Sequence, residues 1–337
     1  MCSYSPALWA LWALNVRPSG RAGDRLSCAE IMSLLAPWIQ AARPLAQVNI
    51  AIPLLFGQAV AFARYGVFDP LVFAVLAAYS VVLHLFIVFA NDVADEEADR
   101  QNPGQSRFAG GSRVLPEGKL RRQDLLQGAF VMAASAISAS LFLTVHCERP
   151  YMLLWPLAAF ALLWAYSFGP LRLAYRGYGE IVQGLGVGVV LPLTAFYAQT
   201  GDLSITALPP LAPALLLGVA GNILTSLPDH PADLAAGKKS YSVRFGPWQA
   251  RRHAIELTLF AAVLGHLVIP DFSRALDLLF AAPAITLAIL GARLLGSADA
   301  QNPDECERFV MLVGGAGHAL LLVWSLALVA IGLALST

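Results

Sequence analysis

The stretch PLVFAVLAAYSVVLHLFIVFANDVADEEAD, residues 70–99, joins an apolar run to an acidic one. Residues 70–90 carry no Asp, Glu, Lys or Arg, and about 20 apolar residues are enough for a helix to cross a bilayer. Five carboxylates follow within residues 91–99. The stretch therefore predicts a membrane-spanning helix that ends in an acidic cluster.

The rest of the chain is equally apolar. Of its 337 residues, 58% are hydrophobic and only 13% are charged, and the mean hydropathy is +0.64. Soluble domains are about 45–50% apolar and about 25% charged, so a soluble globule of this size could not bury so much apolar surface. The composition, with a formal net charge of zero, also excludes a disordered chain and a nucleic-acid binder with a basic face.

We therefore predict an all-α, polytopic membrane protein with one bundle of about nine transmembrane helices. The predicted spans are residues 45–64, 69–90, 125–146, 150–169, 180–199, 207–227, 254–271, 275–296 and 308–335.

The first residues fit this pattern poorly. The apolar stretch Ala7–Val16 is too short to span a bilayer, and no basic segment precedes it, as one would in a signal peptide. Met32 begins a stretch that reads like a natural start. We expect residues 1–31 to be a disordered tail or a mis-called upstream extension, and residues 32–337 to form the transmembrane domain.

The basic residues predict the orientation of the bundle. With nine spans, 19 of the 22 Lys and Arg residues fall on one side of the membrane, and only Arg64, Arg149 and Arg274 fall on the other. Because basic loops stay in the cytoplasm, the N-terminus is expected there. The long loops near residues 91–124 and 228–253 then also face the cytoplasm, which predicts a protein of the inner (plasma) membrane whose chemistry occurs on the cytoplasmic side.

Four oxygen-bearing side chains fall on one stripe of the predicted helix end. Asn91, Asp95 and Asp99 recur at every fourth position, and Asp92 lies three residues before Asp95. Such a stripe is unfavourable unless a cation sits among the oxygens, and hard oxygen ligands suit Mg²⁺, which commonly bridges carboxylates to a substrate's phosphates. The alternative is a solvated acidic helix end.

A second acidic pair favours the metal interpretation. Asp229 and Asp233 are again four residues apart, and Lys238 and Lys239 follow them. Four predicted spans separate the pair from the first cluster, so both should lie on the same side of the membrane. Two such pairs beside basic residues are typical of a shared site for a metal and a diphosphate.

These motifs carry a family resemblance. Asn91–Asp99 resembles the NDxxDxxxD signature of the UbiA superfamily of intramembrane prenyltransferases, and PDHPADLAAGKKSYSVRFG (Pro228–Gly246) resembles its second motif. Within the superfamily, FAGGSRVLPEG (Phe108–Gly118) and YSFGPLR (Tyr166–Arg172) look like segments of the 1,4-dihydroxy-2-naphthoate prenyltransferases of menaquinone biosynthesis. Arg113 and the approach Thr225–Asp229 depart from that group's pattern.

The resemblance implies Mg²⁺-dependent transfer of a polyprenyl group from an allylic diphosphate to an aromatic acceptor within a lipid bilayer, with no nucleic-acid partner. Asp92, Asp95, Asp229 and Asp233 would be catalytic through the metal, with Asn91 and Asp99 as further ligands. The remaining roles it implies are diphosphate binding by Arg107, Lys119, Lys238 and Arg244, and acceptor binding by Tyr166 and Arg172. Each of those four basic residues has an alternative as a plain membrane-orienting charge, which is also how we interpret Arg251.

Two alternatives stay open at this point. First, the aromatic acceptor is either 1,4-dihydroxy-2-naphthoate or one of three alternatives: 4-hydroxybenzoate, homogentisate or a tetrapyrrole. A cation-coupled transporter is a rival of another class, but its acidic residues should lie at mid-membrane rather than at the ends of spans.

Overall fold

The computed structural model describes residues 28–101, 111–203, 208–269, 274–297 and 302–336, and in them the chain is helical without a strand. The helices of the first half are α2 (Cys28–Ala42), η1 (Pro44–Gln47), α3 (Val48–Tyr65), α4 (Pro70–Gln101), α5 (Arg122–His146), α6 (Leu154–Ser167) and α7 (Leu173–Arg176). Those of the second half are α8 (Gly179–Leu185), η2 (Gly186–Val190), α9 (Leu191–Thr200), α10 (Leu208–Thr225), α11 (His230–Ala235), α12 (Tyr241–Phe245), α13 (Pro247–Val268), α14 (Arg274–Ser297) and α15 (Pro303–Ser336).

Helical structure occupies all nine predicted ranges, but not every helix is long and apolar enough to cross a bilayer. Within the described residues, five segments are: Pro44–Tyr65, Pro70–Gln101, Arg122–His146, Gly179–Thr200 and Asp304–Ala334. The prediction of an all-helical, multi-pass membrane protein is confirmed at this level. The number nine and the direction of the N-terminus stay predictions.

Two helix ends matter for the site. The helix that contains the predicted span 69–90 continues to Gln101, so the prediction that the first acidic cluster lies on the end of this helix is confirmed. An ion pair between Arg100 and Glu96, one turn apart, supports that extension. At the N-terminus, α2 begins at Cys28, before Met32, whereas residues 1–27 lie outside the described part, so the expectation of a tail or mis-called start is untested.

The segment expected as one span over residues 180–199 contains an irregularity. The α-helical α8 and α9 are joined by η2, a π-helical stretch over Gly186–Val190. Here Gly188 packs against α10: a Cβ on it would lie 2.4 Å from the Cα of Leu215. A small residue at this point therefore permits close approach of the two helices.

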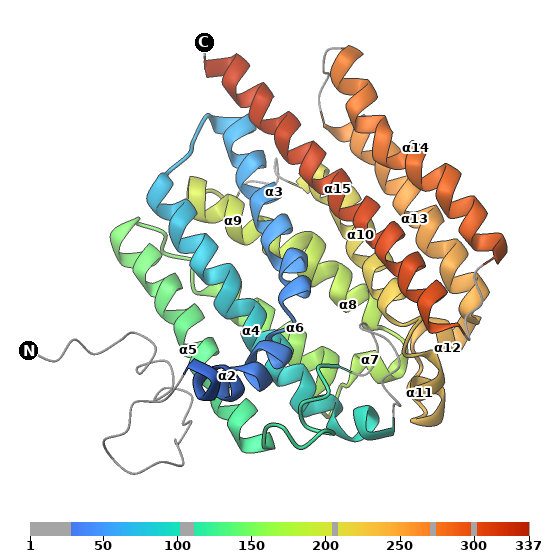
Figure 1. Cartoon of the computed structure of the whole chain (residues 1–337). Coiled ribbons are helices and arrows are strands. Elements are labelled where there is room, and N and C mark those ends of the chain that lie inside the picture. The colour runs from blue at the N-terminus through green and yellow to red at the C-terminus, as the bar shows by residue number, and fades with distance from the viewer. Residues whose placement is uncertain (1–27, 102–110, 204–207, 270–273, 298–301, 337) are drawn as a thin grey trace, which may run out of the picture.

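Close helix packing also joins the first and second halves of the bundle. A Cβ on Gly57 of α3 would lie 2.0 Å from the carbonyl oxygen of Pro192 in α9. On the other side of α3, the long helix α15 packs across it (Figure 1), with Phe56 and Trp324 in one buried cluster. These contacts hold together the helices of the bundle, and the charged segments lie at its ends.

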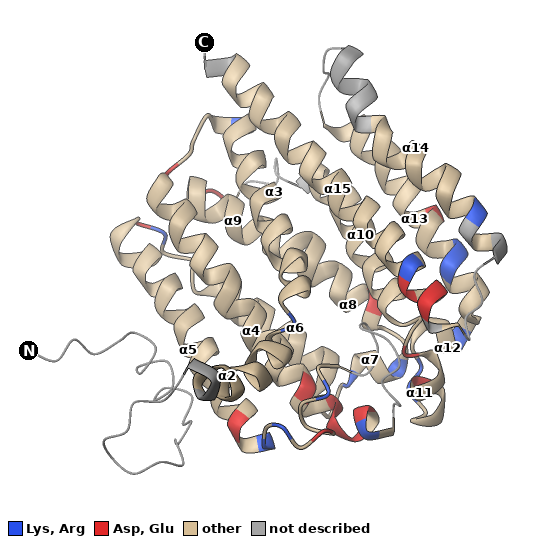
Figure 2. Cartoon of the chain, in the orientation of Figure 1, with Lys and Arg blue, Asp and Glu red and all other residues tan. Residues whose placement is uncertain are grey.

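Charged residues of the described part gather toward one end of the bundle. Figure 2 shows them around the C-terminal end of α4, the short elements α7, α11 and α12, and the neighbouring parts of α13 and α15. The end of α2 reaches the same region, where Trp38 packs edge-on against Phe89 of α4. The bundle thus brings its N-terminal helix, both acidic motifs and several basic residues to one place.

Candidate active site

The first acidic cluster lies on the buried side of α4. Asp92, Asp95 and Asp99 are only 3%, 9% and 9% exposed, and Asn91 is half-buried, whereas Glu97 faces outward. The predicted stripe is therefore present, and it points into the protein. Carboxylates buried to this degree need partners, because an unpaired buried charge is strongly destabilising.

Asp92 has partners from two distant segments. Arg43, just after α2, forms an ion pair with Oδ1 of Asp92. Ser112 donates its hydroxyl to Oδ2 and its backbone N–H to Oδ1, the latter across 3.4 Å. Gly111 precedes it in the left-handed region at φ 65°, and a Cβ there would lie 2.3 Å from an oxygen of Asp99. The loop therefore approaches α4 as closely as its backbone permits.

Asp95 is held from the opposite side. Tyr175 in α7 donates its hydroxyl to Oδ1 across 2.9 Å, and the amide of Asn91 lies 3.4 Å from Oδ2. Asn91 is oriented in turn by the hydroxyl of Ser167, which donates to its carbonyl oxygen across 3.0 Å. The guanidinium of Arg172 stacks over the Tyr175 ring at 3.9 Å.

The second acidic motif meets the first through Lys238. Its Nζ lies 3.5 Å from Oδ1 of Asp233, which is 5% exposed, and 5.3 Å from the centre of the Tyr175 ring. Burial alone would lower the pKa of Lys238, but the carboxylates of Asp95 and Asp233, with Asp229 further off, raise it well above its usual value. The ammonium group thus stays charged between the two motifs.

Burial also acts on the second motif. It raises the pKa of Asp233, and the neighbouring Lys238 opposes that rise. Asp229 lies at the N-terminal end of α11 and is half-buried. Segments more than 130 residues apart in the chain, near Asp95 and Asp229, therefore share one polar region.

Other residues expected at the site have different surroundings. Lys119 pairs with Glu117 at 2.7 Å, and Arg244 pairs with the buried Glu180. Tyr166 accepts a hydrogen bond of 3.0 Å from Asn222. Arg107 lies outside the described residues.

Sequence reasoning missed three partners of the acidic stripe: Arg43, Ser112 and Tyr175. Arg43 was counted only as a membrane-orienting charge, and no sequence spacing links these residues to Asp92 or Asp95. Arg251, interpreted as a plain membrane anchor, is instead 2% exposed, with its guanidinium 5.9 Å from the centre of the Phe309 ring.

The donors suit a hard divalent cation in their chemistry. They are carboxylate and amide oxygens from two segments, the type of ligand that Mg²⁺ takes. Among the described residues, however, three or more acidic, His or Cys side chains are not gathered around one point. Instead Arg43, Tyr175 and Lys238 contact the carboxylates, so a metal would have to displace these groups or bind the carboxylate oxygens beside them.

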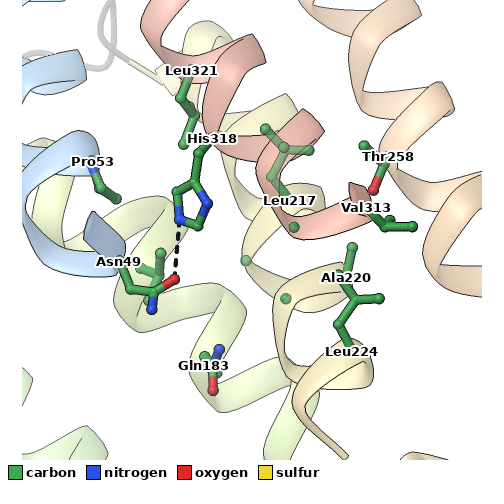
Figure 3. A pocket seen from close by; sticks show the side chains of 15 residues that line it. Asn49, Pro53, Gln183, Leu217, Ala220, Leu224, Thr258, Val313, His318 and Leu321 are labelled. Carbon is green, nitrogen blue, oxygen red and sulfur yellow. Dashed lines mark hydrogen bonds between the residues drawn. The ribbon is translucent and has the colours of Figure 1, made fainter. Parts of the chain in front are cut away.

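A pocket lies inside the bundle, next to a polar chain that starts at the site. Asn222 donates to Tyr166 and, across 2.8 Å, to Gln183, and Gln183 lines the pocket. Apolar residues and glycines supply most of its wall, as Figure 3 shows. His318 and Asn49 also line it and form a 3.1 Å hydrogen bond with each other.

A family model described as the UbiA prenyltransferase family matches residues 50–316 of the chain. The chain belongs to the UbiA prenyltransferase family. Both acidic motifs, residues 91–99 and 228–246, lie within the matched range.

Relatives with assigned names agree on this class. A 2-carboxy-1,4-naphthoquinone phytyltransferase of Synechocystis is 26% identical over 62% of this chain and 66% of its own length, so the match spans slightly under two thirds of that relative. A 1,4-dihydroxy-2-naphthoate octaprenyltransferase of Bacillus subtilis is 24% identical over 66% of this chain and 68% of its own. A 4-hydroxybenzoate octaprenyltransferase of Pseudomonas fluorescens is 30% identical over 56% and 59%.

Solved structures share the fold. A UbiA homolog from Archaeoglobus fulgidus, bound to DMAPP and Mg²⁺, superposes with a TM-score of 0.61 at 18% identity, covering 87% of this chain and 99% of that one. The apo structure of a UbiA homolog from Aeropyrum pernix K1 gives 0.60 at 18% identity, over 86% and 97%.

Proposed function

We propose that this UbiA family member transfers a polyprenyl group from an allylic diphosphate to an aromatic acceptor, with Mg²⁺ at the two acidic motifs. The observation that carries the proposal is the position of Lys238 beside Asp233 and close to Tyr175, the partner of Asp95. A cation among buried carboxylates from two motifs is what a diphosphate with its metal needs.

The acidic and basic residues of the two motifs have different proposed roles. Asn91, Asp92 and Asp95 would hold one Mg²⁺ and Asp229 and Asp233 another, with Asp99 in support. When bound, the metal neutralises the departing diphosphate. Lys238 supplies positive charge to the same oxygens. Arg107 is a further candidate for the diphosphate, whereas Lys119 and Arg244 would first have to leave their carboxylate partners.

The prenyl group needs an apolar binding site that excludes water. An allylic cation formed when the C1–O bond breaks must be shielded from water until a ring carbon attacks it. Tyr166 and the half-buried Tyr175 lie near Lys238 and the motifs, and aromatic rings at such positions can stabilise a cation. Tyr166 and Arg172 are proposed to orient the acceptor, and the glycine-lined pocket to receive the start of the prenyl chain.

We infer 1,4-dihydroxy-2-naphthoate as the acceptor, in menaquinone biosynthesis. The sequence segment Phe108–Gly118 and the naphthoate-named relatives support this choice. A 4-hydroxybenzoate acceptor is the second candidate, favoured by the Pseudomonas fluorescens relative at 30% identity.

The proposed setting is a multi-pass protein of the inner (plasma) membrane with nine spans and a cytoplasmic N-terminus. The charges gathered at one end of the bundle support a cytoplasmic active site (Figure 2).

The test is an assay of the purified protein in detergent with Mg²⁺, a polyprenyl diphosphate and a panel of aromatic acceptors. A prenylated naphthoate that disappears on chelation of Mg²⁺ is the expected result. Asp95→Asn and Asp229→Asn should each abolish turnover at normal expression. If no acceptor were prenylated, the proposed function would be wrong, and near-normal activity of either variant would refute the two-motif metal site.

A further inference from the structure

Gln40 of α2 forms a hydrogen bond with the loop over the first acidic motif, residues 111–119. The amide nitrogen of Gln40 donates to the backbone carbonyl of Ser112 across 2.7 Å. Ser112 is 7% exposed, and both its hydroxyl and its backbone N–H point to the carboxylate of Asp92. Gln40 therefore reaches Asp92 through one intermediate residue.

The same amide also organises the outer part of the loop. The Gln40 nitrogen lies 3.1 Å from Oε2 of Glu117, and its oxygen accepts a 2.8 Å hydrogen bond from Nζ of Lys119. Glu117 pairs with Lys119 and, at 3.5 Å, with Arg113. Because Glu117 and Lys119 are exposed, their ion pair contributes little to stability. Their effect is to fix the shape of the loop.

Apolar contacts hold the loop to the same two helices. Val114 and Leu115 are buried in a cluster with Trp38 of α2 and Val93 of α4. The loop thus cannot shift over α4 without moving α2. The partly buried hydrogen bond from Gln40 to the backbone carbonyl of Ser112 adds a polar link between α2 and the loop.

We propose that Gln40 is a positioning residue for the first metal motif: it fixes Ser112, which fixes the carboxylate of Asp92. This rests on the proposed function for its consequence, since an oriented Asp92 matters as a metal ligand. It also gives Lys119 a part in shaping the loop in place of one in holding the diphosphate. Partners that orient a metal ligand typically contribute about 10–100-fold to metal affinity or activity.

The test compares variants in full-length protein. Gln40→Leu removes the link. Gln40→Glu keeps an oxygen for Lys119 but cannot donate to Ser112, so it separates the two contacts. Gln47→Leu is the matched control, because Gln47 is also half-buried and donates to a serine, Ser80, across 3.1 Å.

We expect Gln40→Leu and Gln40→Glu to raise the Mg²⁺ concentration for half-maximal activity about tenfold, while Gln47→Leu leaves it unchanged. Ser112→Ala should have a similar effect. The effect of Gln40→Leu/Ser112→Ala should be smaller than the sum of the two single effects, because Ser112→Ala already removes the hydroxyl that Gln40 positions and leaves only the backbone N–H contact with Asp92. Ser112→Thr, which keeps the hydroxyl, should retain more of the wild-type Mg²⁺ response.

Two measurements are independent of turnover. Hydrogen exchange of the backbone over residues 111–119 should rise in Gln40→Leu and not in Gln47→Leu, and Mn²⁺ binding followed by electron paramagnetic resonance should weaken in parallel. Wild-type Mg²⁺ dependence and Mn²⁺ affinity in Gln40→Glu would overturn the proposal, as would additive effects in the double variant. If the wild-type protein transferred no prenyl group, the proposed function would be wrong. The hydrogen-exchange and Mn²⁺-binding data would still decide whether Gln40 positions the loop and Asp92.

Discussion

The hydroxyl of Tyr175 in α7 donates a hydrogen bond to Oδ1 of Asp95 in α4 across 2.9 Å, although the two residues are 80 positions apart in the chain. Tyr175→Phe removes this donor and leaves the packing in place. Hydrogen bonds to charged groups contribute about 1.5–3 kcal/mol, so we expect prenyl transfer to fall about tenfold or more, measured as kcat/KM. Tyr178→Phe, at an exposed tyrosine three residues on, should have little effect; an equal loss in both variants would contradict a specific role.

Arg43 holds the carboxylate that the first metal is proposed to use. Arg43→Gln should lower the melting temperature without Mg²⁺, because Asp92 is 3% exposed and loses its cation. Mg²⁺ should then raise the melting temperature more in the variant than in wild type, since the metal no longer competes with Arg43. Arg100→Gln, which breaks an exposed pair with Glu96, is the control. Equal Mg²⁺-induced shifts in Arg43→Gln and wild type would show that Asp92 does not bind metal.

Arg244 tests whether a basic residue in the second motif serves the substrate or the fold. It pairs with Glu180, which is 7% exposed, and losing one partner of such a pair should cost about 2 kcal/mol. We expect Arg244→Gln to lower stability while KM for the diphosphate stays within about twofold of wild type, and Lys238→Gln to raise KM many-fold. The double variant Glu180→Gln/Arg244→Gln should cost less than the sum of the single ones. A large KM effect of Arg244→Gln alone would restore its diphosphate role.

Bulk in the pocket should change which prenyl diphosphates are used. Gly317 lines the pocket, and a Cβ there would meet only Leu217 within 4 Å, at 3.6 Å. Gly317→Leu should therefore fold and should lower kcat/KM for long prenyl diphosphates more than for dimethylallyl diphosphate. Gly315→Leu, two residues away on a face with nothing within 4 Å, should leave that ratio unchanged. If the ratio of kcat/KM for long and short prenyl diphosphates were the same in the wild type and both variants, the prenyl chain would bind outside this pocket.

Gly57 limits how α3 and α9 approach each other. Gly57→Ala would place a methyl group 2.0 Å from the carbonyl oxygen of Pro192, and such overpacking typically costs about 1–3 kcal/mol. We expect a lower melting temperature in detergent. Gly315→Ala should be neutral or stabilising, because alanine favours a helix and the site is open. A wild-type melting temperature in Gly57→Ala would mean that the two helices can separate freely.

The sequence predicted those parts of the site that depend on local spacing. Asn91, Asp95 and Asp99 share a face because they recur at helical intervals, and that face is present in α4. Because an even number of predicted spans separates the two motifs, the sequence predicted that they lie on the same side of the membrane. In the structure Lys238 lies between them.

The remaining contacts depend on how distant segments pack. Arg43 and Tyr175 reach the cluster from 49 and 80 positions away, and no periodicity or composition marks such a pairing. Lys119 and Arg244 were expected near the diphosphate because they are basic, but nearby carboxylates compete for them. Charge alone predicts the region of a residue and not its partner.

The π-helical stretch Gly186–Val190 adds a residue to a helix without lengthening it by a full step. Because the π turn absorbs this extra residue, the helix on either side of it keeps its facing. Deleting one residue within Gly186–Val190 should let the segment relax to regular α-helix and leave Tyr197 buried beside Trp155. Deleting one residue from the regular α-helix between Leu191 and Phe196 should instead turn everything after it by about 100° and carry Tyr197 away from its neighbours. A single-residue deletion in this span should therefore be tolerated in the π-helical stretch and not in α9.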